Sequence, residues 1–176
     1  MLLVAKTQEG FEHLKKQFQE RTIQKTYHTF VYNHFNETQG VVDRPIGKSR
    51  KDFRLWSAQR GARGKMREAI TEYTVLTTTK EVSFLEVLLH TGRTHQIRVH
   101  LNHIGHSLIG DPLYGSSRKI STRDDPNLKL AKEFKRQALH AKSLEFVHPF
   151  KQERVHFSVP LPSDMQTLLE ALRKSF

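Results

Sequence analysis

The sequence contains no cysteine, which excludes a disulfide framework and any metal site built on thiolates. It also lacks long apolar runs. The longest near its start, Leu2 to Ala5, is too short for a signal-peptide core or a membrane span. We therefore expect a cytoplasmic protein without membrane contact. Its 176 residues have the length of one ordinary domain, so we expect residues 1–176 to form a single domain.

Several catalytic motifs are missing as well. The spacing Gly61-x-x-Gly64-Lys65 does not match a Walker loop, and no G-x-G-x-x-G is present, so we expect no nucleotide cofactor. His100 and His103 lie one helical turn apart, but no carboxylate or cysteine stands at a matching spacing and H-E-x-x-H is absent. We expect no metal. A serine or cysteine nucleophile has no support, because G-x-S-x-G and cysteine are both lacking.

Acidic residues are scarce. Only 18 Asp and Glu stand against 29 Lys and Arg, which leaves a net charge of +11 and favours a polyanionic partner. Residues 44–67 hold nine basic side chains and one acid, and residues 118–136 hold seven against three. The first window also contains Phe53, Leu55 and Trp56, which suits contact with an RNA strand. Two other interpretations stay open: basic loops that serve solubility, and a core strand that contains Trp56.

Hydrophobic periodicity predicts six strands, at residues 2–6, 24–32, 69–77, 82–90, 139–147 and 153–159. Helices are expected after Thr7, after Thr94 as far as Gly105, and from a capping box at Ser163 to Gln166. The elements do not alternate strictly. This order predicts an α+β fold, with a mainly antiparallel mixed sheet and flanking helices. The first strand begins in mid-pattern, so we expect an amino-terminal portion of the sheet to be missing.

The densest polar run extends from His90 to His100, across an expected strand end, a glycine turn and the start of a helix. Free backbone N–H groups at such a helix start favour an anion, and Arg93, His95 and Gln96 add polar side chains there. Ile97 and Arg98 are neighbours on the helix, so one can face the core while the other reaches the edge of a cleft. Asp111, before Pro112, is interpreted as a turn residue.

The run from Thr91 to Leu101, followed by Gly110 to Gly115, resembles the signature of the RluA-type RNA pseudouridine synthases. Five further stretches agree with the same family: Leu2 to Lys6, Lys25-Thr26-Tyr27, Ala69-Ile70-Thr71, Ala138 to Ala141 and His148-Pro149. The resemblance covers nearly all of the chain. It implies a pseudouridine-synthase-like catalytic domain that isomerises uridine to pseudouridine in ribosomal or transfer RNA. The family needs neither cofactor nor metal.

The resemblance also implies roles for single residues. Tyr27 would lie against the flipped base, Ile97 would pack beside it, and Arg98 would pair with the catalytic aspartate, which a guanidinium keeps ionised. Together with the charge pattern, it marks eight residues as RNA contacts: Lys25, Arg54, Arg60, Arg63, Lys65, Arg93, His95 and Gln96.

One part of the family pattern is absent. The nucleophilic aspartate of the family lies in an R-L-D-x-x-T-S-G loop just before the strand that here begins at Leu2, and this sequence has no such loop. We therefore expect the chain to be catalytically incomplete and to self-associate through an exposed sheet edge. Two alternatives remain: an RNA-binding protein that derives from a synthase but does not modify RNA, and a basic ribosome-associated structural protein.

Overall fold

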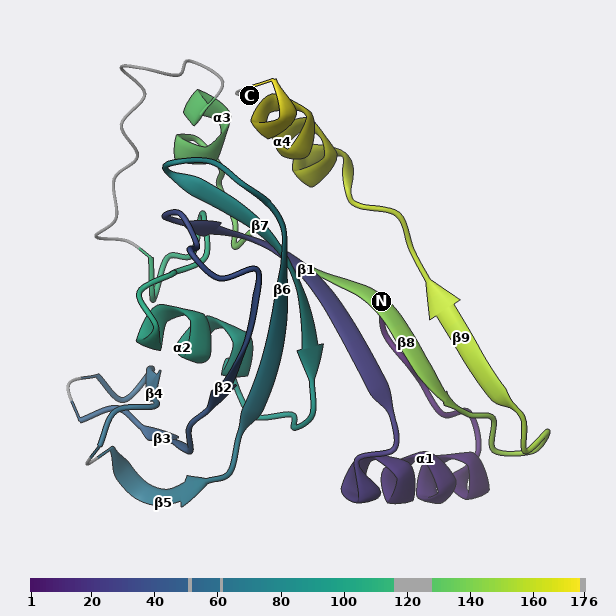
Figure 1. Ribbon diagram of the computed structural model, residues 1–176. Coiled ribbons are helices and arrows are strands. Elements are labelled where there is room, and N and C mark those ends of the chain that lie inside the picture. Colours follow the sequence, from purple (N-terminus) through teal and green to yellow (C-terminus); the bar gives the residue numbers. More distant parts are fainter. Residues whose placement is uncertain (51, 61, 116–127, 175–176) are drawn as a thin grey trace.

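The computed structural model describes residues 1–50, 52–60, 62–115 and 128–174 (Figure 1). The helices in this part are α1 (Gln8–Glu20), α2 (Gln96–His103), α3 (Lys129–Lys132) and α4 (Ser163–Arg173). The strands are β1 (Gln24–Tyr32), β2 (Gln39–Asp43), β3 (Ile46–Lys48), β4 (Trp56–Ser57), β5 (Arg63–Arg67), β6 (Ile70–Thr78), β7 (Val82–Leu89), β8 (Leu139–Val147) and β9 (Arg154–Ser158). All strand pairs are antiparallel, so the predicted α+β class is confirmed.

Six strands form the main sheet in the order β2-β6-β7-β1-β8-β9, which places β1 inside it between β7 and β8. Alternate residues of β1 face opposite sides, as the period of a strand requires. Phe30 packs in the core cluster that includes Met165 of α4, and Val31 packs in the cluster that includes Leu101 of α2. The sheet is thus covered by α4 on one face and by α2 on the other.

Most predicted elements are present. The strand expected at 24–32 is β1, and those expected at 69–77, 82–90, 139–147 and 153–159 match β6, β7, β8 and β9 to within a residue. Thr7 caps α1, because its Oγ1 accepts a hydrogen bond of 3.1 Å from the backbone N–H of Gly10. Period-2 and helical patterns therefore located five of the six strands of the main sheet and the first helix, whereas β2 was not predicted.

The strand predicted at residues 2–6 is wrong, since this segment has no regular structure. Leu3 and Ala5 pack against the cluster of Leu14, Ile23 and Phe146, whereas Leu2 and Val4 are 87% and 70% exposed. The segment lies against a face of the sheet and does not join an edge. Its alternating pattern thus arises from side chains that meet the sheet surface at every second position.

Both other helix starts differ from the expected capping. His95, not Thr94, precedes α2, with a left-handed backbone (φ 57°) and no side-chain cap. Pro162 precedes α4 without a side-chain cap, and the backbone N–H of Gln166, which the capping box assigned to Ser163, donates to the Pro162 carbonyl at 2.8 Å. Ser163 is the first residue of the helix and does not precede it, so its side chain does not cap this end.

The basic window at 44–67 contains a small sheet in the order β4-β3-β5, which the sequence did not predict. Its anchor is a cluster of Ile46, Ala58, Ala69 and Val99, against which Trp56 packs. Trp56 therefore belongs to a small core, as one interpretation held, whereas Phe53 is 83% exposed. In Figure 1 the small sheet lies at the lower left and α1 lies below the lower ends of β1 and β8.

Of the second basic stretch, 118–136, only residues 128–136 are among the described ones. Within the described chain, no helix combines the length and the apolar character that a membrane span requires.

Candidate active site

A cleft of about 280 Å³ opens between β1, the end of β7, the start of α2 and the start of β8. Six of the predicted site residues line it: Tyr27, Arg93, His95, Gln96, Ile97 and Arg98. Leu89, Gln137 and Leu139 complete the lining. The cleft therefore brings together the three residues to which the resemblance gives catalytic roles, although Tyr27 is far from the other two in the sequence.

The order of the strands in the sheet explains why Tyr27 lies beside Ile97 and Arg98. Tyr27 in β1 lies opposite Val87 of β7 on one side and Ala141 of β8 on the other. The chain leaves β7 at Leu89, turns, and enters α2 on the face of the sheet to which Tyr27 points. Ile97, only 4% exposed, anchors this helix in the core and holds the start of α2 beside Tyr27.

Arg98 makes a buried ion pair with Asp111. Its Nε and Nη2 each donate a hydrogen bond of 2.7 Å to the carboxylate, and the two side chains are 9% and 0% exposed. Burial alone would raise the pKa of Asp111, but hydrogen bonds from Arg98 and from the backbone N–H groups of Tyr114 and Leu113 hold this pKa below its usual value. Asp111 is the turn residue that was predicted, and it also fixes the guanidinium.

The remaining edge of the Arg98 guanidinium has no partner in the described part of the chain, because no hydrogen bond involves Nη1 there. The contact with a catalytic aspartate that the resemblance implies stays a prediction. The carboxylate that Arg98 contacts in this structure is Asp111.

Tyr114 connects the cleft to the small sheet. Its ring lies under the guanidinium of Arg98, with 4.9 Å between the guanidinium carbon and the ring centroid. Its hydroxyl accepts a 2.9 Å hydrogen bond from the backbone N–H of Trp56 and lies 3.1 Å from Nδ1 of His95. Burial, and then the charge of Arg98, lower the pKa of His95. This histidine therefore favours its neutral form beside the guanidinium.

Gln96 has a structural role in place of the predicted RNA contact. Its amide oxygen accepts from the Thr91 hydroxyl and from the backbone N–H of Arg93, at 2.8 and 2.9 Å. Its amide nitrogen donates to the Ile70 carbonyl and the Thr71 hydroxyl, at 2.9 and 3.0 Å. With 2% exposure and both amide atoms satisfied twice, the side chain has no capacity left for RNA. It fastens β6 to the turn before α2.

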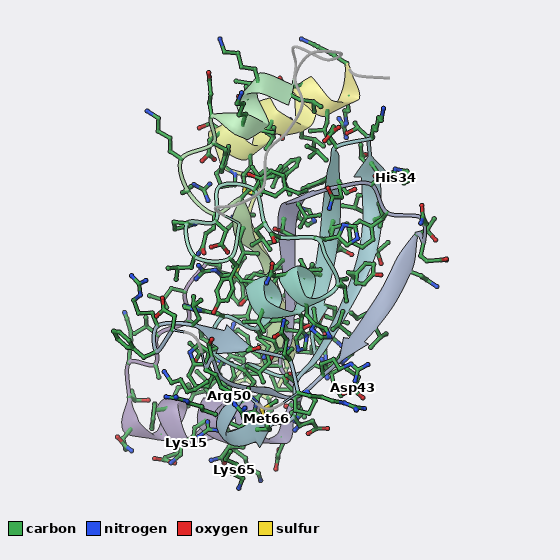
Figure 2. The ribbon with its side chains drawn as sticks, turned by 90° about the vertical axis from the view of Figure 1, so that its left-hand side faces the viewer. Lys15, His34, Asp43, Arg50, Lys65 and Met66 are labelled. Atoms are coloured by element: carbon green, nitrogen blue, oxygen red, sulfur yellow. The ribbon has the colours of Figure 1, made fainter. Side chains whose placement is uncertain are left out.

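The other predicted RNA contacts lie outside this cleft. Arg63 and Lys65 are exposed on β5, Arg60 lines a separate cavity with Trp56 and Tyr114, and Arg54 is held by an ion pair with Asp52 at 2.7 Å. Figure 2 shows Lys65 and Arg50 of the basic window at the same end of the molecule as Lys15 of α1. Basic side chains of both segments therefore lie at one end of the molecule.

Of the two histidines considered as metal ligands, His100 has other partners. His100 is buried, with Nδ1 2.9 Å from the Thr71 hydroxyl and Nε2 2.9 Å from the carbonyl oxygen of Arg44. Burial lowers the pKa of His100. Among residues 1–50, 52–60, 62–115 and 128–174, no three His, Asp or Glu side chains converge in the manner of a metal site.

The model of the RNA pseudouridylate synthase family matches residues 1–103, which is more than half of the chain. The chain belongs to this family.

Two curated relatives are each named ribosomal large subunit pseudouridine synthase D. The protein of Zymomonas mobilis is 41% identical over 172 residues, which cover 98% of this chain and 52% of the relative. That of Nitrosomonas europaea is 41% identical over 174 residues, covering 98% and 48%. A solved structure, human RNA pseudouridylate synthase domain containing 4, superposes with a TM-score of 0.75 at 25% identity, covering 95% of this chain and 69% of that one. The chain spans about half the length of these curated relatives.

Sequence reasoning missed four residues at the site. Tyr114 and Leu139 stand within stretches that carry the resemblance, so the signal was present but no role was drawn from it. Leu89 was counted only as part of a strand. Gln137 gave no signal, because its place in the cleft depends on where β8 begins.

Proposed function

We propose that this chain forms one wall of the active site of an RNA pseudouridine synthase. In that reaction the bond from C1′ of a uridine to N1 breaks, a bond from C1′ to C5 forms, the hydrogen on C5 leaves and N1 gains a proton. The observation that supports the proposal is the cleft in which Tyr27, Ile97 and Arg98 meet. The names of the curated relatives favour a synthase over an RNA-binding protein that does not modify RNA.

The cleft suits a base that has left its stack. Leu89, Ile97 and Leu139 offer apolar contacts, and Tyr27 offers an aromatic face and a hydroxyl. Burial raises the pKa of Tyr27, which keeps the phenol protonated and able to donate a hydrogen bond. In this proposal a uracil base lies against Tyr27 with its edge toward Arg98.

Arg98 would orient the nucleophile. Asp111 balances its charge and fixes its plane, so the edge at Nη1 is held ready for a second carboxylate. By resemblance this carboxylate is an aspartate in a segment that is not among these 176 residues. Met1 and Leu2 line a cavity of about 210 Å³ together with Tyr27, so the first residues of the chain lie beside the proposed site.

The substrate in this proposal is ribosomal or transfer RNA. The words "ribosomal large subunit" in the names of the relatives favour the ribosomal choice. We further propose that residues 1–176 form part of one catalytic domain and that the protein acts in the cytoplasm. Self-association through a sheet edge, where β2 and β9 are the outer strands of the main sheet, would appear as a dimer in light scattering, and a monodisperse monomer would contradict it.

Release of tritium from RNA labelled at C5 of uridine tests the function. We would replace the matched region of the Zymomonas mobilis relative with this chain and measure release by the chimera and by the chain alone. We expect release by the chimera, loss of at least about 100-fold in its Arg98→Lys variant because a lysine cannot hold two carboxylates in one plane, and no release by the chain alone. An Arg154→Lys chimera, changed at an exposed ion pair on β9, is the matched control.

The outcomes separate two claims. A folded chimera that releases no tritium would contradict the proposed activity of this wall. Release by the 176-residue chain alone would instead contradict the inference that it lacks its nucleophile.

A further inference from the structure

A second cavity, of about 370 Å³, lies between the last turns of α1, the start of β1 and the turn that precedes α2. Lys15, Arg21, Lys25 and Arg93 contribute four positive charges to its lining, and no acidic side chain of the described chain lines it. Two of these charges are balanced nearby, because Arg21 pairs with Glu68 at 2.6 Å and Lys15 with Glu12 at 3.1 Å. Lys25 and Arg93 form no ion pair in the described part of the chain.

Lys25 is the unusual member of this group. Its side chain is half buried, and its Nζ has no hydrogen-bond acceptor among the described residues. The Nζ atom of Lys25 lies 5.6 Å from the ring centroid of Phe18. It also lies close to Gly92, because a Cβ atom added to that glycine would be 3.6 Å from Nζ. Burial lowers the pKa of Lys25, as expected for a cation that has lost water without gaining an anion. A cation that gives up solvent in this way is stabilised by an anionic ligand.

Arg93 is positioned from the opposite side. Its Nε donates a 2.9 Å hydrogen bond to the backbone carbonyl of Glu68, and its backbone N–H is fixed by Gln96. The carbonyl orients the guanidinium, and the Glu68 carboxylate, whose pKa is lowered first by Arg21 and then by Arg93, is shared by the two arginines. Two cations beside one carboxylate leave a net positive charge at the cavity.

This cavity shares lining residues with its neighbours at the candidate active site. Arg93 also lines the cleft with Tyr27, Ile97 and Arg98, and Lys25 also lines the cavity that contains Met1, Leu2 and Tyr27. Lys25 and Tyr27 are two residues apart on one face of β1, about 7 Å along the strand. This separation is comparable with that between the base of a nucleotide and the phosphate on its sugar.

We propose that Lys25 and Arg93, supported by Arg21, bind one backbone phosphate of RNA next to the nucleotide whose base enters the cleft. The inference rests on the proposed function, which requires RNA to approach this face, and it adds which part of the RNA the cavity takes. Two cations held on opposite sides suit the tetrahedral phosphate group, whereas neither contact reads a base. The cavity therefore positions the strand and carries no sequence preference.

The test uses the full chain and a nine-nucleotide RNA that has one central uridine among adenosines. The RNA carries a fluorescent label at its 5′ end, and its affinity for the chain is measured by fluorescence anisotropy. A series of such RNAs carries one uncharged methylphosphonate at successive linkages. In the unchanged chain we expect one linkage beside the uridine to weaken binding about tenfold when it is neutralised, the size of one charge-assisted hydrogen bond.

Lys25→Met keeps the length of the side chain and removes its charge. We expect this variant to lose its sensitivity at that one linkage, and the slope of log affinity against log salt to fall by about 0.7. Lys25→Arg retains a cation and is expected to keep the sensitivity. Lys80→Met, at an exposed lysine in the turn between β6 and β7, is the matched control and should leave the whole series unchanged.

Each other outcome has its own meaning. If the chain binds none of these RNAs, the proposed function fails together with the inference. If it binds them but the series is flat, or if Lys25→Met leaves the series unchanged, only the phosphate site is overturned. If inorganic phosphate raises the melting temperature of the unchanged chain but not of Lys25→Met while the series is flat, the cavity is a free-anion site and the inference is also overturned.

Discussion

Replacing Asp111 with asparagine tests the account of the buried ion pair. The asparagine would keep an oxygen that can accept from the backbone N–H groups of Leu113 and Tyr114, so the turn survives. The guanidinium of Arg98, at 9% exposure, would then be buried without an anion. Removing one partner of a buried pair costs about 3–5 kcal/mol. We expect about 3 kcal/mol, because the new amide oxygen and the ring of Tyr114 still contact the cation.

The chain contains a matched control. Arg136 and Asp164 form an ion pair with the same two-point geometry, at 2.8 Å for both contacts, but their side chains are 44% and 43% exposed. For Asp164→Asn we expect a loss of no more than about 1 kcal/mol, since solvent screens an exposed pair. The two substitutions change the same atoms, so their difference measures the effect of burial.

Urea denaturation followed by the fluorescence of Trp56, the only tryptophan, is the assay. Urea is chosen over guanidinium because it carries no charge. For a chain of this length, a loss of about 3 kcal/mol lowers the melting temperature by about 6–12 °C. If Asp111→Asn costs no more than Asp164→Asn, the reasoning about the buried pair is refuted.

The pH dependence gives a second check on the same substitution. The pKa of Asp111 is lowered in the folded state, so its contribution to stability is fully present above the unfolded value of 3.8 and is lost as the pH falls through the folded value. The difference between the unchanged chain and Asp111→Asn should therefore be constant near neutral pH and shrink in acid. A difference that persists undiminished in acid would point to a cause other than the charge.

Three further predictions concern stability. Gln96→Leu leaves four polar groups without their partner and should cost at least about 2 kcal/mol in urea denaturation, whereas a loss of RNA affinity at unchanged stability would restore the RNA contact first assigned to Gln96. Tyr114→Phe keeps the ring under Arg98 but removes the acceptor for the backbone N–H of Trp56, so we expect about 1 kcal/mol of lost stability and altered Trp56 emission, and an unchanged spectrum would count against this link. Burial lowers the pKa of four histidines, which are His28, His95, His100 and His140. The unfolded chain therefore takes up protons near pH 6.5 where the folded chain does not, so the free energy of unfolding should fall as the pH drops below 6.5. We expect a less steep fall in His100→Gln, and equal slopes would disprove the contribution of His100.

The sequence predicted five of the six strands of the main sheet because their side chains pack against core clusters, whereas β2, in which only Val42 is buried, was missed. The alternation from Gln24 to Tyr32 is imposed by two packed helices, so it is strong and ends where the packing ends. The small sheet was missed because its strands are short and largely exposed, as in β5, where the pattern of burial gives no period. Residues 2–6 resembled a strand for a different reason, because their alternate side chains Leu3 and Ala5 pack against the sheet.

Some residues of the candidate site could also be predicted from the sequence, and others could not. The cluster around Ile97 and Arg98 could be found because a helix start places its residues by local rules, and the resemblance added Tyr27. The partner of Arg98 could not be found, since the approach of Asp111 depends on how a turn folds back on α2. For Gln96, the residue type indicated a polar contact, but only the fold shows that the contacts are internal.

The inner position of β1 determines which molecule must change shape when RNA binds. Tyr27 and Lys25 are carried by a strand that is hydrogen-bonded to β7 on one side and β8 on the other, so it cannot shift without breaking both ladders. Its amides should be among the slowest in the protein to exchange with deuterium. A rigid receptor of this kind leaves the distortion to the nucleic acid. Under the proposed function, we therefore expect it to prefer uridines in loops or beside mismatches, which leave their stack at low cost.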